Sequence, residues 1–144
     1  MTKLAREVMT PDPARCSVTA TLDEVAKLMV QHDCGEIPIV DRADRPVGVI
    51  TDRDIVCRAV AAGKNPTGQF VESVMTHRVV TVRADAPLEE VVTTMERHQI
   101  RRVPVVDESG CCVGIIAQAD LASQARPGEA VELLRELSRH TPNA

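Results

Sequence analysis

The chain has 144 residues, of which 44% are hydrophobic, enough for one compact module or two closely paired subdomains but too few for two independent domains. A net charge of −4, from 17 basic and 21 acidic residues, gives no general attraction to nucleic acid or to an anionic membrane. Phe70 is the single aromatic residue on which a base could stack. We therefore expect neither nucleic acid nor a membrane as a partner.

The start of the chain, residues 1–7, lacks the long apolar run of a signal peptide. No segment approaches the roughly 20 apolar residues of a membrane span. The cysteines show no CxxC spacing and lie mostly in apolar runs, so we expect reduced thiols rather than disulfides. They are Cys16, Cys34, Cys57, Cys111 and Cys112. These features predict a cytoplasmic protein.

The sequence is duplicated without a gap. Met9-Thr10 recurs as Met75-Thr76, and every further match lies at the same offset of 66 positions (75 − 9, 120 − 54). A unit of this size buries little core alone, so the two copies are expected to pack around a pseudo-twofold axis. The other matched pairs include Pro38 and Pro104, Gly48 and Gly114, and Asp54 and Asp120. The organisation expected is a first repeat at 8–62, a connection at 63–73, a second repeat at 74–126, and a C-terminal helix and tail at 127–144.

An amphipathic helix is predicted early in each copy. Thr21 and Glu24 have the spacing of a capping box, and apolar residues follow at helical spacing from Leu22 to Met29. The second copy repeats this face from Leu88 to Met95, with Pro87 in the first turn. Both helices are expected to end near a histidine, at His32 and His98.

A buried strand hairpin is predicted after each helix, because two short apolar runs flank a polar turn. The proline of each first run is expected at a strand start or edge. A second helix should follow each hairpin, so each repeat is predicted to fold β-α-β-β-α, in the α/β (α+β) class. The apolar runs are 37–41 and 47–50, then 103–107 and 113–116, and the second helices are at about 52–61 and about 118–125.

The densest polar cluster lies where a buried strand runs into a helix, at Thr51, Asp52, Arg53 and Asp54. Strand ends that feed helix N-termini often bind phosphorylated ligands, because free backbone N–H groups favour anions. Asp54 has the chemistry to accept both hydroxyls of a ribose, Thr51 to bond the ribose or phosphate, and Arg53 to face the phosphate. Thr51-x-x-Asp54 is also a helix-capping pattern that needs no ligand.

The second copy keeps Asp120 but has Ala117 in place of Thr51. If capping were the only use of the acid, it would have less reason to persist without its hydroxyl partner. A carboxylate at that position still favours a helix start, so both interpretations stay open.

Arg101 and Arg102 lead into the second buried hairpin. Adjacent arginines point in different directions, so one of them is expected to face the space between the repeats, where a phosphate would serve as its anion. The alternative is a pair of surface charges that contact Glu96 or Asp107.

Neither a metal site nor an enzyme is expected. The histidines at the two helix ends are predicted to cap the last carbonyls or to cover the core, and neither they nor Cys111-Cys112 have a recognised ligand spacing. No set of nucleophile, base and orienting group can be assembled from these motifs.

Taken in order, these motifs resemble the cystathionine-β-synthase (CBS) domain, and the chain is similar to a tandem CBS pair, or Bateman module, of the small stand-alone bacterial kind. The resemblance extends from Arg6 to Leu121. It implies a regulatory module whose inter-repeat clefts bind adenine nucleotides such as AMP, ADP or ATP, or in some members S-adenosylmethionine or NAD, with no cofactor required. The motifs that carry it are Val8-Met9-Thr10, Ile37-Pro38-Ile39-Val40-Asp41 and Gly48-Val49-Ile50-Thr51-x-x-Asp54, each with its second-copy counterpart.

The resemblance also implies roles for individual residues. Thr51 and Asp54 would hold ribose and phosphate, and Arg101 and Arg102 would contact the phosphate. Adenine would lie among aliphatic side chains and backbone at Val49, Val80, Thr81 and Ile100. A second site, with Asp120, Ile115 and Gly35, is expected to be weak or vacant, because Ala117 replaces the hydroxyl residue and Glu36 would repel a phosphate.

We expect a homodimer whose exposed apolar helix faces form the contact, and a separate effector protein that reads the occupied state. The alternative is a structural or stress-related dimeric interaction protein with vestigial nucleotide clefts. A DNA-associated regulator is disfavoured by the charge and by the lack of a recognised reading helix.

Overall fold

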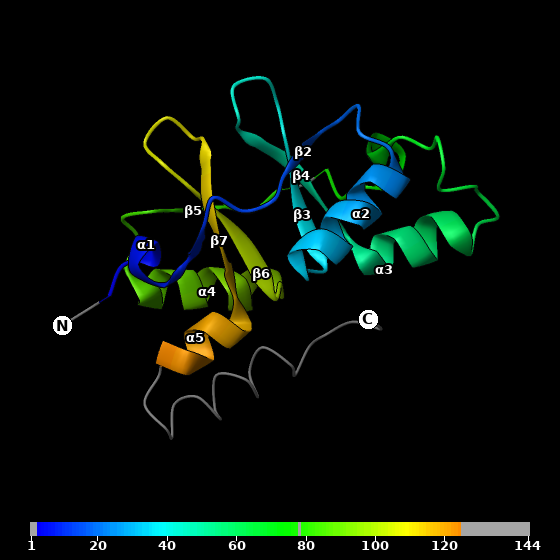
Figure 1. Cartoon of the computed structure of the whole chain (residues 1–144). Coiled ribbons are helices and arrows are strands. Elements are labelled where there is room, and N and C mark those ends of the chain that lie inside the picture. The colour runs from blue at the N-terminus through cyan, green and yellow to red at the C-terminus, as the bar shows by residue number, and fades with distance from the viewer. Residues whose placement is uncertain (1–2, 78, 125–144) are drawn as a thin grey trace. The chain divides into compact units, whose positions relative to one another are not determined.

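The computed structural model describes residues 3–77 and 79–124, and it divides into two compact units (Figure 1). The repeat-1 unit is Ala14–Val79, and the repeat-2 unit combines Met1–Pro13 with Val80–Ala144. Each unit has its own sheet and its own buried apolar cluster. The helix and tail expected at 127–144 lie outside the described residues.

The repeat-1 unit follows the predicted order of strand, helix, strand, strand and helix. Its sheet has the order β2-β3-β4, with β2 parallel to β3 and β3 antiparallel to β4. The predicted final helix has only a first turn of α-helix and then continues as a π-helix. The elements are β2 (Cys16–Ser17), α2 (Leu22–His32), β3 (Glu36–Val40), β4 (Pro46–Thr51), α3 (Asp52–Asp54), a π-helix (Ile55–Val60) and a 3-10 helix (Val71–Ser73).

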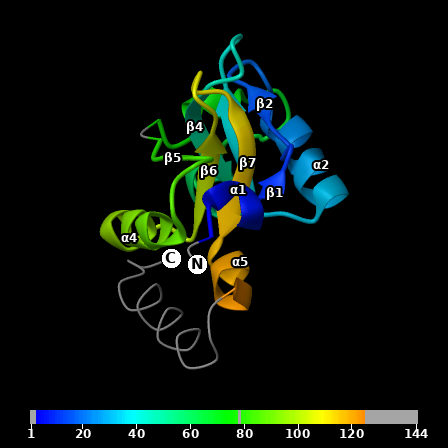
Figure 2. The same ribbon diagram turned by 90° about the vertical axis from the view of Figure 1, so that its left-hand side faces the viewer.

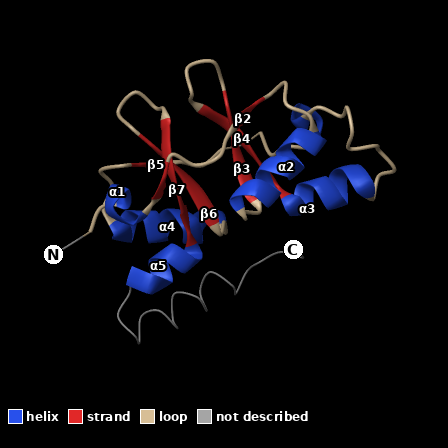
Figure 3. Ribbon diagram, in the orientation of Figure 1, coloured by secondary structure: helices blue, strands red, loops and turns tan. Residues whose placement is uncertain are grey.

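The repeat-2 unit repeats the three strands and the long helix 66 positions later, and it adds one strand at the sheet edge. Its sheet has the order β1-β7-β6-β5. Figure 3 shows the same alternation of strands and helices in each unit. The elements are α1 (Ala5–Val8), β1 (Thr10–Pro11), β5 (Val82–Arg83), α4 (Leu88–His98), β6 (Arg102–Val106), β7 (Cys112–Ala117) and α5 (Gln118–Gln124).

The long helices α2 and α4 begin differently but end in the same way. The Glu24 carboxylate accepts from the Thr21 N–H at 3.2 Å, as the capping-box spacing predicted. Helix α4 begins at Leu88, so Pro87 precedes the helix instead of lying in its first turn. Asp33 and Gln99 take the left-handed conformation that ends each helix, with φ of 50° and 53°.

The prolines of the two hairpins lie at the middle of central strands, so the prediction of a strand start or edge was wrong. Pro38 is the third residue of β3, and its neighbour β2 pairs only with Ile39 and Val40. Because β2 does not extend to Pro38, the β2–β3 ladder needs no hydrogen bond from the Pro38 nitrogen, which has no proton to donate. The same holds for Pro104 of β6, whose parallel partner β5 pairs only with Val105 and Val106.

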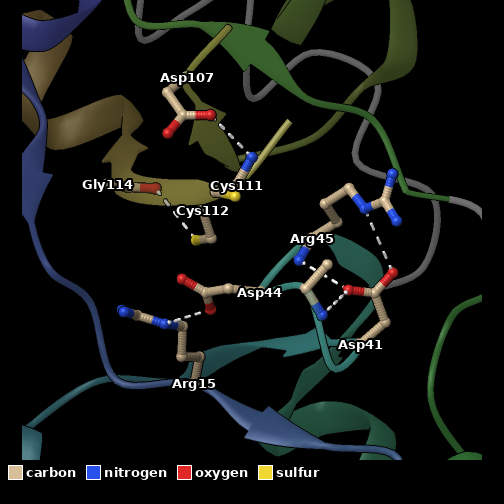
Figure 4. Close-up of polar contacts among 9 residues, drawn as sticks. Arg15, Asp41, Asp44, Arg45, Asp107, Cys111, Cys112 and Gly114 are labelled. Atoms are coloured by element: carbon tan, nitrogen blue, oxygen red, sulfur yellow. Dashed lines mark hydrogen bonds and ion pairs between the residues drawn. The ribbon is translucent and has the colours of Figure 1, made fainter. Parts of the chain in front are cut away.

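Each hairpin turn is closed by an aspartate that accepts from two backbone N–H groups. Figure 4 shows the contacts of Asp41 and the bond between Cys111 and Asp107. Asp41 Oδ1 accepts from the N–H groups of Ala43 and Arg45, at 2.9 and 3.0 Å. Asp107 Oδ1 does the same with Ser109 and Cys111, at 2.9 and 3.0 Å. The bond from the Arg45 N–H is the main reason that the pKa of Asp41 lies below its ordinary value.

The residues around the start of each repeat, 5–11 and 71–76, pack on the unit that contains the hairpin of the other repeat. Ala5 is fully buried in the repeat-2 unit, where its N–H donates to the Ala86 carbonyl at 2.8 Å. Thr10 of β1 pairs with Ile115 of β7, and Figure 2 shows α1 beside β7 and α5. In the repeat-1 unit, Thr76 makes the equivalent bridge to Val49. Each unit is thus completed by the opening segment of the other sequence repeat.

The repeated glycines make room for these crossing segments. A Cβ on Gly48 would lie 2.7 Å from the Thr76 carbonyl oxygen, and one on Gly114 would overlap the side chain of Met9. The conserved spacing of Met-Thr and Gly in the two copies therefore has a steric cause.

Candidate functional site

The predicted site residues are divided between the two units. Those of the repeat-1 unit are Gly35, Val49, Thr51, Arg53 and Asp54. Those of the repeat-2 unit are Val80, Thr81, Ile100, Arg101, Arg102, Ile115 and Asp120.

Thr51 and Asp54 form a closed capping box at the start of α3. The Thr51 hydroxyl accepts from the Asp54 N–H at 3.1 Å, and Asp54 Oδ2 accepts from the Thr51 N–H at 3.0 Å. The Asp54 side chain is only 13% exposed, and its Oδ1 lies 3.7 Å from Arg58 Nε. The capping interpretation of this motif is confirmed, and it leaves Oδ1 beside a cation.

Asp120 retains half of this box. Its Oδ2 accepts from the Ala117 N–H at 2.8 Å, although alanine offers no hydroxyl in return. Asp120 therefore has a structural use of its own, and its persistence in the second copy is no evidence for a ligand.

Two equivalent dipeptides, Gly35-Glu36 and Arg101-Arg102, lie at the start of the two hairpins, each beside the capping motif of its own unit. The Asp52 N–H donates to the Gly35 carbonyl at 3.0 Å, and the Gln118 N–H donates to the Arg101 carbonyl at 2.8 Å. In register, Arg102 is opposite Ala117. The exposed arginines 101 and 102 thus belong to the unit of Asp120, whereas Thr51 and Asp54 belong to the other unit.

The residues predicted to contact adenine are partly buried aliphatic groups. Val49 bonds Thr76 through both backbone groups, at 3.0 and 2.9 Å. Val80 and Ile100 pack against the repeat-2 core. Val80 and Thr81 directly precede β5, which begins at Val82.

The structure does not assign the histidines at the helix ends the roles expected of them. His32 and His98 are exposed, and the carbonyls at the ends of α2 and α4 accept from the backbone N–H groups of Asp33 and Gln99. Within residues 3–77 and 79–124, no three His, Cys, Asp or Glu side chains are grouped so as to hold a metal ion. In the same residues, no helix has the length and apolar character needed to cross a membrane.

The family is decided by a direct match of the sequence. Residues 5–60 and 71–126 each match the CBS domain. The chain belongs to the CBS domain family. The two matches reproduce the duplication and confirm the resemblance that the motifs carried.

Two relatives place this CBS pair among small proteins. Hypoxic response protein 1 of Mycobacterium tuberculosis is 38% identical over 118 residues, which are 82% of each chain. An uncharacterised protein of Methanopyrus kandleri, MK0525, is 38% identical over 116 residues, 81% of this chain. The match spans 57% of the length of MK0525.

Solved CBS pairs have the same fold. A crystal structure of Hypoxic Response Protein I with two coordinated zinc ions is 36% identical and has a TM-score of 0.78, covering 86% of this chain and all of that one (100%). The CBS domain pair of protein MJ0100, solved with 5′-methylthioadenosine and S-adenosyl-L-methionine, is 31% identical with a TM-score of 0.77. That match covers 86% of this chain and 96% of the other.

Sequence reasoning missed Arg58. It lies four residues after Asp54, which is the helical spacing at which opposite charges meet, so the signal was present. Arg58 also donates from a terminal guanidinium nitrogen to the Val74 carbonyl, at 3.2 Å.

Proposed function

We propose that this CBS pair is a regulatory module that binds an adenosine-containing ligand of the AMP, ADP or ATP class and relays its occupancy by a change in conformation or oligomeric state. The observation that carries the proposal is the similarity to the MJ0100 CBS pair, which was solved with two adenosine compounds. A ligand that prefers one state of the module shifts the equilibrium by that preference, which is all that regulation requires.

The proposed ribose contacts are Thr51 and Asp54. Asp54 Oδ2 is engaged by the capping box, while Oδ1 lies beside Arg58 at a distance too long for a hydrogen bond. A carboxylate oxygen in this position is suited to accept from ribose hydroxyls.

The remaining contacts follow the sequence-based prediction. We propose Arg53, Arg101 and Arg102 for the phosphate, because guanidinium groups bind phosphate with paired N–H donors. Adenine would contact Val49, Val80, Thr81 and Ile100. The second site, with Asp120, Ile115 and Gly35, should bind weakly or not at all.

A pair of matched substitutions tests the assignment. Asp54→Asn keeps an oxygen for the Thr51 N–H but removes the charge, and Asp120→Asn does the same in the second copy. We expect Asp54→Asn to weaken AMP binding about tenfold or more, since a hydrogen bond to a charged group contributes ~1.5–3 kcal/mol. Asp120→Asn should bind like the wild type. Isothermal titration calorimetry with AMP and ATP measures both, and equal affinities in the two variants would refute the site.

A second candidate function is a structural, dimeric interaction protein with vestigial clefts. It is favoured by the closed capping box, which gives Thr51 and Asp54 a complete structural use without a ligand. Thermal unfolding against a panel of adenine nucleotides separates the two functions. A ligand-binding module gains about 2.7 kcal/mol at a ligand concentration one hundredfold above its Kd, whereas a vestigial one gains nothing.

We also propose that the module acts as a homodimer whose state is read by a separate effector protein. The exposed apolar side chains available for the dimer contact in the repeat-1 unit include Val56 and Val60 of the π-helix, which are 57% and 55% exposed. Light scattering of the wild type and of a Val56→Glu, Val60→Glu double variant tests this, and a wild-type monomer would contradict it.

A further inference from the structure

Arg58 links the capping box to the segment that completes the repeat-1 unit. It lies on the π-helix Ile55–Val60, one turn after Asp54. Its Nε is 3.7 Å from Asp54 Oδ1, and a terminal nitrogen donates to the Val74 carbonyl at 3.2 Å. The guanidinium is therefore held at one end by the backbone while its other edge faces the carboxylate.

The carboxylate of Asp54 depends on this neighbour. Only 13% of its side chain is exposed, and a carboxylate removed from water is costly unless opposite charge or hydrogen bonds compensate it. The Thr51 N–H holds Oδ2 at 3.0 Å. Arg58 supplies the positive charge beside Oδ1, but at 3.7 Å it does not use up that oxygen as a hydrogen-bond acceptor.

The backbone anchor of Arg58 is itself rigid. Val74 is 2% exposed, and its N–H donates to the Val71 carbonyl at 3.0 Å. Two residues later, Thr76 bonds both backbone groups of Val49. The position of the guanidinium is thus fixed by the same segment that is bonded to Val49, the residue proposed to contact adenine.

The second copy lacks this arrangement. Four residues after Asp120 stands Gln124, which carries no charge, and its side-chain oxygen accepts from Lys3 Nζ. Arg58 and Gln124 are therefore a third difference between the two copies. The first is Thr51 where the second copy has Ala117, and the second is Gly35-Glu36 where the second copy has Arg101-Arg102.

We infer that Arg58 is a positioning residue of the nucleotide site, which orients the Asp54 carboxylate so that Oδ1 accepts a ribose hydroxyl. This inference rests on the proposed function. Arg58 acts on the ligand only through Asp54, so its contribution to affinity exists only where a ribose hydroxyl is there to be accepted.

The test compares ligands with and without ribose hydroxyls. AMP, 2′-deoxy-AMP and 3′-deoxy-AMP are titrated calorimetrically into the wild type, Arg58→Gln and Arg58→Lys. Arg58→Gln should weaken AMP binding about threefold to fivefold, the range set by a partly exposed ion pair. For the deoxy ligand that lacks the hydroxyl bound by Asp54, Arg58→Gln should leave the affinity unchanged. Arg58→Lys, which keeps the charge, should recover most of the AMP affinity.

Two controls separate positioning from folding and from net charge. Urea unfolding of Arg58→Gln shows whether the variant is folded at the titration temperature, and Arg42→Gln removes an equal charge from an exposed turn residue. If Arg58→Gln weakens AMP and both deoxy ligands by the same factor, or none of them, the inference is overturned while the proposed function stands. If the wild type binds no AMP, the proposed function fails and the inference fails with it.

Discussion

The repeat-1 and repeat-2 units share three strands and one long helix at one offset, yet they differ at the helix that follows the hairpin. In the repeat-1 unit this helix opens with a closed capping box and continues as a π-helix; in the repeat-2 unit it opens with half a box and continues as an α-helix. π-helical turns are rare and often accompany functional sites. One duplicated scaffold therefore carries two different helix starts, and the start with the closed capping box carries the Asp54–Arg58 pair.

The largest loss of stability should come from substitutions in the segments around residues 5 and 71, each of which packs in the unit that holds the other repeat's hairpin. Ala5 and Val71 are equivalent, and both are fully buried, each in the unit of the other repeat's hairpin. Ala5→Asp and Val71→Asp should each cost about 3–5 kcal/mol, the usual result of an uncompensated buried charge. Ala5→Asp should loosen β6 and β7, and Val71→Asp should loosen β3 and β4.

Hydrogen exchange with mass spectrometry locates the loss of protection for each of these variants. Arg6→Asp is a suitable control, because this side chain is exposed. If Ala5→Asp instead reduced the protection of β3 and β4, each repeat would fold from its own contiguous sequence, and the assignment of residues 5–11 to the repeat-2 unit would be wrong.

The two glycines sharpen the same comparison at smaller cost. A Cβ on Gly48 meets the backbone oxygen of Thr76, which cannot move without breaking the bridge to Val49. A Cβ on Gly114 meets the side chain of Met9, which has several rotatable bonds. Gly48→Ala should cost about 1–3 kcal/mol, as overpacking does, and Gly114→Ala should cost less. Urea denaturation measures both, and equal losses would contradict the asymmetry.

Local pattern was enough to predict the long helices and the hairpins but not the segments that pair with them. The 3.6-residue periodicity gave α2 and α4, and paired apolar runs gave the hairpins, because both signals lie within a few residues. The pairing of Thr10 with Ile115 joins residues far apart in sequence, and no local rule contains it. The central prolines were misplaced for a related reason: a two-residue β2 leaves room for them, and a strand that short has no periodic signature.

At the candidate site, the sequence predicted which hydrogen-bonding groups Thr51 and Asp54 offer, but not how many of them already bond to the backbone. The capping box was foreseen from spacing alone, and it uses the Thr51 hydroxyl and one oxygen of Asp54. For Asp120 the sequence left a capping and a ligand-binding interpretation open, and the structure shows the capping contact, a bond from the Ala117 N–H. The spacing of Arg58 from Asp54 is a local signal, but its contact with the Val74 carbonyl is not, because the two residues are 16 positions apart.

The two helix starts can be interchanged by single substitutions. Thr51→Ala removes the hydroxyl that accepts from the Asp54 N–H and should cost ~1 kcal/mol, the typical loss for a threonine cap. Ala117→Thr adds the missing hydroxyl to the second copy and should stabilise the chain by up to about that amount. Opposite shifts of the urea midpoint are expected, and a destabilising Ala117→Thr would show that the second helix start cannot accommodate a cap.

The smallest effect is a difference in alkaline stability between equivalent strand residues. Cys16 of β2 corresponds to Val82 of β5, and burial, with a smaller contribution from the Glu24 charge, raises the pKa of the Cys16 thiol from 9.0 to about 11. The unfolded chain therefore loses this proton at a lower pH than the folded chain. The stability that the neutral thiol contributes is complete below pH 9 and declines as the pH rises toward 11. Cys16→Val makes the two strands alike and should flatten the decline between pH 8.5 and 10.5 in urea titrations. Cys57→Ala, at an exposed thiol, should leave the decline as it is in the wild type. An unchanged slope in Cys16→Val would mean that burial does not raise the pKa of the Cys16 thiol.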